Sequence, residues 1–169
     1  LGSSLFGAQF AAEMGLPYGF ASHFAPALMM DAIAVYRQRF RPSEFLAKPH
    51  VMLGVNVVIG DTDVEARQMF TSHQQAFVNL RRGTLGPLPP PDAHFLEGLS
   101  AQERWEIDQT LSAATVGSLR HVQAALEEFI GRTQADELIL VAQIYDHAAR
   151  LRSYEQAASL REHIGTGMR

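Results

Sequence analysis

The stretch that most constrains the fold is the run VMLGVNVVI at residues 51–59, which is apolar at almost every position. A strand with one face in water alternates apolar and polar residues, whereas a strand covered on both faces is apolar throughout. The run is therefore typical of a buried strand in a parallel sheet. Because parallel strands need long crossover connections, usually helices, this single stretch favours an α/β fold.

Apolar periodicity divides the rest of the chain into alternating strands and helices. The first four residues, LGSS, are expected to be the end of a strand that turns into a helix, and further strands are expected at Tyr18–Phe24, Val51–Ile59 and Glu137–Tyr145. Helices are expected at Leu5–Met14, Ala27–Phe40, Thr62–Arg82, Ser100–Leu111 and His147–His163. One more helix is expected before the last strand, with a core face formed by Val122, Leu126, Phe129 and Ile130. Two of these helices begin with capping boxes, TDVE and SAQE. The order predicts about four strand–helix units with parallel strands, and an extra helix before the last strand.

Four strand–helix units are half of the eight in a TIM barrel. This number fits half a (β/α)8 barrel better than a doubly wound sheet, which periodicity alone does not exclude. We expect residues 1–169 to form a single partial domain, interrupted by an insertion loop at 83–99 that opens with GTLGPLPPPD. The loop is either a solvated connector or an active-site lid, and as a lid it would bring Arg81 and Arg82 near an anionic ligand.

Charge and cysteine content narrow the class of partner. The net charge is −4, with 14 Lys and Arg against 18 Asp and Glu, so we expect neither nucleic acid nor a membrane surface as a partner. The absence of Cys excludes disulfides, thiolate metal sites and cysteine nucleophiles. No apolar run reaches the roughly 18 residues that a membrane span needs, and no signal-peptide pattern is present. The cytoplasm is the simplest expected compartment.

The first residues, LGSSLFG, suggest an anion site. Where a strand passes into a helix, small residues such as Ser3 and Ser4 leave the first backbone N–H groups of the helix open to an anion, which the helix dipole also favours. The simpler alternative is that one Ser is an ordinary N-cap. The segment is neither a Walker loop nor a Gly-x-Gly-x-x-Gly dinucleotide motif.

Three polar residues near the ends of expected strands are weak candidates for a substrate pocket. His23 lies near the carboxyl end of the second strand, where α/β folds place their chemistry. Asn56 and Gln143 interrupt the apolar strands that contain them. Each has a structural alternative, because a buried imidazole or amide can also be satisfied by hydrogen bonds inside the barrel.

No self-contained catalytic or metal site is visible. His50, His73, His94, His121 and His163 lack metal-ligand spacing, and Asp61 and Asp63 are better explained as charges that cap a helix. We therefore expect no metal and leave the catalytic residues unassigned.

Several spaced blocks occur in an order that carries a family likeness: LGSSLFGAQFAAEMGLPYGFASHFAP, PHVMLGVNVVIGDTDVEARQMF, QQAFVNLRRGTLGPLPPP and ADELILVAQIYDHAARLRSYE. From Leu1 to Glu155 the chain resembles the C-terminal half of bacterial luciferase-like, flavin-dependent monooxygenases. The resemblance implies a TIM barrel that uses reduced FMN and O2 to oxygenate a small organic substrate. It also implies an NAD(P)H:flavin reductase as partner, and contact of Ser3, Ser4 and Gly7 with the flavin phosphate.

The first half of such a barrel has no counterpart in the sequence. A half-barrel exposes two sheet edges and an apolar interior, so we expect either a fragment, inactive in isolation, or half-barrels that assemble as a homo-oligomer. The alternative function is a non-catalytic flavin- or phosphate-binding, dimerising half-barrel. Another half-barrel that handles a phosphorylated metabolite is a third hypothesis, and the choice between FMN and a deazaflavin stays open.

Overall fold

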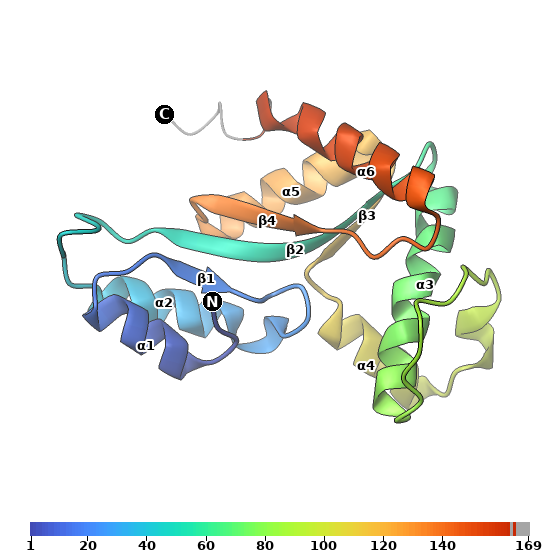
Figure 1. Cartoon of the computed structure of the whole chain (residues 1–169), viewed down its shortest axis with the longest axis horizontal. Helices are drawn as coiled ribbons and strands as arrows, with labels where there is room; N and C mark the ends of the chain where they lie inside the picture. The colour runs from blue at the N-terminus through green and yellow to red at the C-terminus, as the bar shows by residue number, and fades with distance from the viewer. Residues whose placement is uncertain (163, 165–169) are drawn as a thin grey trace. The chain divides into compact units, whose positions relative to one another are not determined.

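The α/β architecture and the parallel sheet are confirmed by the structure, a computed structural model that describes residues 1–162 and 164 (Figure 1). Within those residues the sheet contains β1 (Tyr18–Phe20), β2 (Val51–Ile59), β3 (Ala114–Gly117) and β4 (Glu137–Val141). Strands β1 and β3 pair in parallel with β2, which also pairs with β4. Gly2 forms an isolated parallel bridge to Phe20, so the expected strand end at the first residues is one bridge long.

The helices are α1 (Leu5–Glu13), α2 (Met29–Arg39), α3 (Asp63–Arg81), α4 (Ala101–Thr110), α5 (Leu119–Thr133) and α6 (His147–Ser159). Short 3-10 turns cover Pro26–Leu28, Phe95–Gly98 and Leu160–Glu162. The expected end of the last helix, His163, lies outside the described residues.

The described residues group into two compact units, which share strand β2. Unit 1 contains Leu1–Val55, Gln109–Ala113 and Ile130–Val141, and unit 2 contains Asn56–Asp108, Ala114–Phe129 and the described residues from Ala142 onward.

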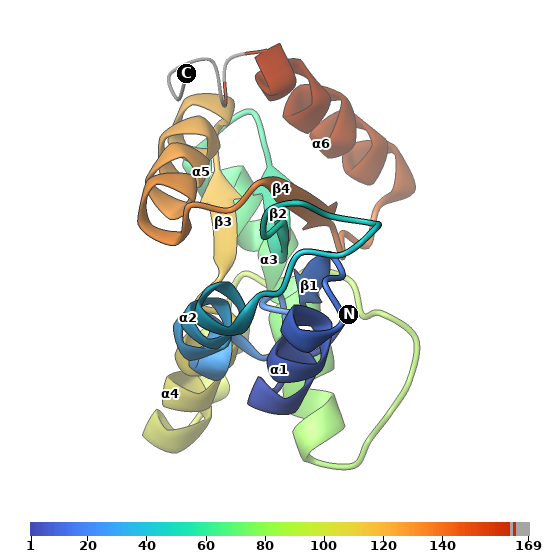
Figure 2. The ribbon, with the colours of Figure 1, turned by 90° about the vertical axis from the view of Figure 1, so that its left-hand side faces the viewer.

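In unit 1, helices α1 and α2 lie side by side (Figure 2). Helix α1 buries Ala8, Ala11 and Ala12, whose small side chains allow a close helix–helix approach. In the same unit the ring of Tyr18 on β1 stacks on the ring of Tyr36 on α2, with centroids 5.2 Å apart. The core of unit 1 therefore contains both small helix residues and stacked aromatic rings.

In unit 2, helix α3 packs against β3. Its N-cap is Thr62, whose hydroxyl accepts a hydrogen bond from the N–H of Glu65 at 3.2 Å, as the TDVE capping box predicts. One residue further on, the Asp63 carboxylate accepts a 2.7 Å hydrogen bond from the N–H of Ser118, just before α5 begins. This bond holds the pKa of Asp63 below its usual range. The start of α3 thus also fixes the start of α5.

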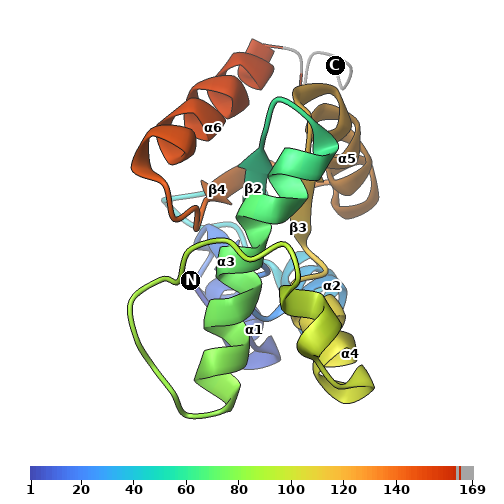
Figure 3. The same ribbon diagram turned by 90° about the vertical axis from the view of Figure 1, so that its right-hand side faces the viewer.

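The segment 83–99 leaves the C-terminal end of α3 and returns alongside the helix (Figure 3). Thr71 accepts a 2.9 Å hydrogen bond from the N–H of Asp92, and Gln75 donates a 2.8 Å bond to the carbonyl of Pro90. The proline-rich stretch, which has no helical hydrogen bonds of its own, is therefore tied to α3 by side chains.

Two expected strands are shorter than the apolar pattern indicates. The second ends at Phe20 because the next residues turn back, with the N–H of Ser22 donating to the Phe20 carbonyl at 2.9 Å. The last ends at Val141 because the N–H of Ala142 donates to the Tyr154 hydroxyl at 2.9 Å. Strand β3 was not expected, since its four residues are too few to show a period.

Among the described residues, no helix combines the length and apolar character needed to cross a membrane.

Candidate functional site

The register of unit 1 fixes which residues share the carboxyl edge of the sheet. Gly2 lies opposite Phe20, and Phe20 lies opposite Leu53. The N–H of Gly2 donates to the carbonyl of Gly19 at 2.8 Å, and its own carbonyl accepts from the N–H of Ala21 at 2.9 Å. Because the strands are parallel, the residues that follow these positions emerge at one edge, where α/β folds carry their binding sites.

Ser3 and Ser4 form the turn from this edge into α1, and both are exposed. Ser4 is the N-cap and has extended backbone, with φ −139° and ψ 164°. Its side chain makes no capping hydrogen bond, unlike Thr62 on α3 and Asp146 on α6. The hydroxyl of Ser4 and the first amides of α1 are thus not committed to one another, which leaves hydrogen-bond donors for an anion.

The turn lies over Tyr18. The phenol of Tyr18 donates to the carbonyl of Ser4 at 3.3 Å. A Cβ on Gly2 or on Gly7 would sit 3.7 Å from the Cα of the other glycine, in ordinary van der Waals contact. Burial raises the pKa of Tyr18 to about 12, so the phenol stays protonated and remains a donor at neutral pH. Tyr18, on β1, therefore contacts this turn, and the sequence pattern did not single it out.

His23 lies at the same edge, three residues after β1 ends. Its imidazole is half-buried, packs over Gly54 of β2 and meets the ring of Phe24 edge-on at 4.9 Å. Burial lowers the pKa of His23, so the imidazole is neutral at pH 7 and can both donate and accept. The neighbouring Ser22 hydroxyl donates to the Gly54 carbonyl at 2.6 Å. Gly54 is therefore the position against which the His23 ring is fixed.

The other two expected pocket residues belong to unit 2. Asn56 is 2% exposed and lies opposite Ala114 in the β2–β3 pair, so its expected burial in a strand is confirmed. Gln143 is exposed and follows the end of β4, so its expected burial within the last strand is wrong. The cause is the hydrogen bond from Ala142 to Tyr154, which takes the backbone out of the sheet just before Gln143.

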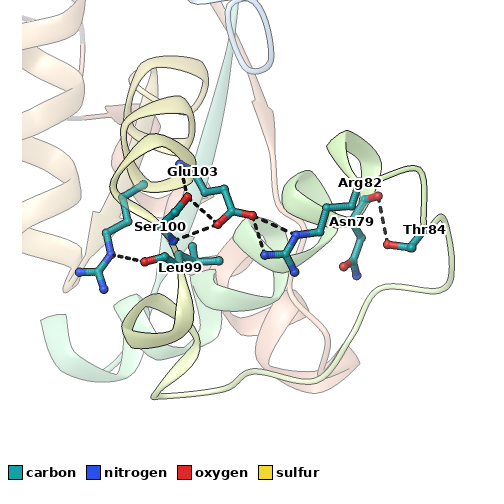
Figure 4. A network of polar contacts seen from close by, with 7 residues as sticks. Asn79, Arg82, Thr84, Leu99, Ser100 and Glu103 are labelled. Carbon is teal, nitrogen blue, oxygen red and sulfur yellow. Dashed lines mark hydrogen bonds and ion pairs between the residues drawn. The ribbon is translucent and has the colours of Figure 1, made fainter.

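Arg81 and Arg82, at the start of the 83–99 segment, both contact other protein groups, and Figure 4 shows the contacts of Arg82. Arg82 forms a double contact with Glu103 of α4, Nε at 3.0 Å and Nη2 at 2.5 Å from the same carboxylate oxygen. Glu103 also accepts hydrogen bonds from the N–H and hydroxyl of Ser100, at 2.9 and 2.8 Å. The guanidinium of Arg81 lies 5.2 Å from the ring centre of Phe77. The Arg82–Glu103 contact therefore joins the C-terminal end of α3 to α4, whereas the Arg81–Phe77 contact lies within α3.

No cluster of three or more His, Asp or Glu residues suited to a metal ion occurs in the described part of the chain. His121 approaches Asp63 at 3.9 Å, but that carboxylate is already bound to Ser118.

Comparison with known proteins identifies sequence relatives that match nearly the whole of this chain. No protein-family model matches the chain. It is 44% identical over 164 residues to a luciferase-like monooxygenase of Escherichia coli K12, a match that covers 97% of this chain and 49% of the relative. It is 41% identical over 160 residues to the uncharacterized protein YvbT of Bacillus subtilis, covering 95% of this chain and 48% of that protein.

Among solved structures, apo-MsnO8 superposes with a TM-score of 0.84 at 30% identity, over 95% of this chain and 49% of MsnO8. The oxygenating constituent of 3,6-diketocamphane monooxygenase from Pseudomonas putida, solved with FMN, superposes with a TM-score of 0.60 at 16% identity and shows the fold alone. The chain spans about half the length of the curated relatives it matches. Its fold is accordingly that of half a TIM barrel, and the chain belongs to the luciferase-like monooxygenase family.

Proposed function

We propose that this chain forms the phosphate-binding part of a flavin-dependent monooxygenase, which uses reduced FMN and O2 to oxygenate a small organic substrate. The observation that carries the proposal is the 44% identity to a luciferase-like monooxygenase. The exposed Ser3–Ser4 turn, with an N-cap whose side chain makes no capping bond, adds a donor set that suits a phosphate.

In this proposal the flavin phosphate lies at the start of α1. The hydroxyls of Ser3 and Ser4 donate to phosphate oxygens, and the backbone near Gly7 completes the contact. The dipole of the nine-residue helix adds about 0.3–1 kcal/mol for the negative charge. When bound, reduced FMN supplies the electrons that activate O2.

The neutral imidazole of His23 belongs to the wall of the substrate cavity in the proposed site. It follows β1 at the same edge as the Ser3–Ser4 turn, and burial lowers its pKa. A separate NAD(P)H:flavin reductase supplies the reduced flavin, and a cytoplasmic location for this protein fits a chain without Cys. These partners rest on the family relationship.

The test is a titration of the native protein that contains this sequence with FMN and, in parallel, with riboflavin, which lacks the phosphate. The Ser4→Ala variant loses one hydrogen bond, worth about 0.5–1.5 kcal/mol. We expect its Kd for FMN to rise about two- to thirteen-fold and its Kd for riboflavin to stay unchanged. Flavin fluorescence reports both constants.

Two results would overturn parts of the proposal. An unchanged Kd for FMN in Ser4→Ala would remove Ser4 from the phosphate site. Reoxidation of previously reduced FMN by O2 at the same rate with and without the wild-type protein, under conditions where the protein binds FMN, would favour the non-catalytic flavin-binding alternative.

A further inference from the structure

Tyr18 of β1 contacts the turn into α1 at three points. Its phenol donates to the carbonyl of Ser4 at 3.3 Å. The edge of its ring lies near both glycines of the turn, because a Cβ on Gly2 would be 3.9 Å from Cε2 of Tyr18 and a Cβ on Gly7 would be 3.8 Å from the same atom. The side chain of Tyr18 is 2% exposed, so the turn rests on a buried ring.

The ring of Tyr18 is itself held in place by other buried rings. It stacks on Tyr36 of α2 with centroids 5.2 Å apart, and it meets Phe20 edge-on at 6.2 Å. Both of these partners are fully buried. Side chains packed in this way have few other rotamers open to them. The phenol of Tyr18 is therefore a donor in a fixed position.

A bond to the Ser4 carbonyl also orients the next backbone amide. The peptide bond from Ser4 to Leu5 is planar and trans, so its C=O and its N–H point in opposite directions. With the carbonyl oxygen turned toward the buried phenol of Tyr18, the N–H of Leu5 is turned away from it. Leu5 is the first residue of α1, and an N–H in the first turn of a helix has no acceptor within that helix. The Tyr18 phenol thus sets the direction of an amide that an anion at this turn can use.

We infer that Tyr18 is a positioning residue of the phosphate site, whose phenol holds the Ser4 peptide so that the N–H of Leu5 points at the flavin phosphate. The inference rests on the proposed function, because it needs the phosphate to lie at the Ser3–Ser4 turn. It also explains how Ser4 can serve as N-cap without a capping bond from its own side chain. The turn is held from the buried side by Tyr18, which leaves the Ser4 hydroxyl for the ligand.

Titration of the native protein that contains this sequence, as wild type and as Tyr18→Phe, with FMN and with riboflavin tests the inference. The substitution keeps the ring and removes only the phenol. Because riboflavin lacks the phosphate, the ratio of its Kd to the Kd of FMN measures what the phosphate adds to binding. The bond to Ser4 is longer than the usual length of about 2.7–2.8 Å for a hydroxyl donor, so the effect should be modest. We expect the Kd of FMN to rise about two- to five-fold and the Kd of riboflavin to stay unchanged.

Tyr36→Phe is the matched control. Tyr36 belongs to the same stack and is also buried, and its phenol donates to the carbonyl of Leu16 at 2.7 Å and accepts from the N–H of His50 at 3.1 Å. Neither of these partners belongs to the turn. Tyr36→Phe should lower the midpoint of thermal unfolding at least as much as Tyr18→Phe, and should leave the ratio of the two Kd values at that of wild type. A phenol with a purely structural role changes stability without changing this ratio.

Three results would count against the inference. A ratio in Tyr18→Phe equal to that of wild type would overturn it, and so would an equal fall of the ratio in Tyr18→Phe and Tyr36→Phe. A wild-type protein that binds FMN no more tightly than riboflavin would overturn the phosphate site of the proposed function, and the role of Tyr18 with it. The wild-type ratio therefore tells the failure of the proposed function apart from the failure of the inference alone.

Discussion

Gly54 is the residue whose substitution should report most directly on the His23 environment. A Cβ at this position would collide with Nδ1 of the His23 ring and lie 3.1 Å from its Cε1. The ring is also held by Phe24, so it cannot swing away without cost. We expect Gly54→Ala to lower the free energy of unfolding by about 1–3 kcal/mol, as overpacking does, in urea denaturation.

Two further variants show whether the loss of stability comes from the collision with the His23 ring. Gly98→Ala meets nothing within 4 Å and should leave the free energy of unfolding unchanged within about 0.5 kcal/mol. Adding His23→Ala to Gly54→Ala should recover part of the loss, because the colliding ring is removed. An effect of Gly54→Ala no larger than that of Gly98→Ala would show that the ring is not fixed by Gly54.

The environment of a single residue could be predicted from the sequence where it depends on residues close by in the chain. The exposed turn at Ser3 and Ser4 follows from small residues between a strand and a helix, and their contact with phosphate stays a prediction. The packing of His23 on Gly54 joins residues 31 positions apart, which no local pattern reveals. Gln143 was misjudged for a similar reason, since the hydroxyl that ends β4 comes from Tyr154 on α6.

At the scale of elements, the Arg82–Glu103–Ser100 network links two helices across the 83–99 segment. Hydrogen bonds from the Ser100 N–H first, then from Arg82 and the Ser100 hydroxyl, lower the pKa of Glu103 from 4.5 to about 2. A lowered pKa means that the carboxylate stabilises the fold above about pH 4.5, and that this stabilisation is lost as the pH falls toward 2.

The corresponding prediction concerns the pH dependence of unfolding. Glu103→Gln should be less stable than wild type at pH 7, and the difference should shrink between about pH 4.5 and pH 2. Thermal unfolding across that range measures it. Glu128→Gln, an exposed position on α5, is the matched control. A difference that stays constant with pH would show that the lowered pKa does not contribute to stability.

Element types were predicted well where the signal is local and long. The two capping boxes marked the starts of α3 and α4, and the apolar run marked all nine residues of β2. Strand β3 was not predicted, because four residues, two of them β-branched, are too few to show the alternation of apolar and polar residues that marks a strand. Its presence depends on pairing with Asn56–Ile59, which is a tertiary contact.

At the scale of the whole chain, Arg37 connects parts of unit 1 that are far apart in sequence. Its guanidinium donates to the carbonyl of Thr133 at 3.0 Å and to the carbonyl of Gln134, at the C-terminal end of α5. Gln134 has a positive φ of 53°, the left-handed conformation common just after a helix. Arg37 thus donates hydrogen bonds to carbonyls at the end of α5 that have no N–H partner within the helix.

We expect Arg37→Ala to lower the free energy of unfolding by about 1–2 kcal/mol, the scale of two hydrogen bonds from an exposed side chain. Arg39→Ala is the control two residues away. Its ion pair with Glu13 is 4.0 Å long with both side chains about half exposed, so its loss should cost less than about 0.5 kcal/mol. Equal effects of the two substitutions in urea denaturation would contradict the role of Arg37.

Unit 1 is built from segments that are far apart in the sequence, which matters while the chain is being synthesised on the ribosome. The first 55 residues form this unit together with Gln109–Ala113 and Ile130–Val141, so the nascent chain lacks part of the unit until Val141 has emerged. At about 5–20 residues per second, the apolar start of β2 waits several seconds for its partner β4. During that interval β2 can pair with β1 but not with β4, so part of its hydrogen-bonding backbone stays open to mispairing. Slower translation should therefore lengthen the time during which this part of β2 can mispair.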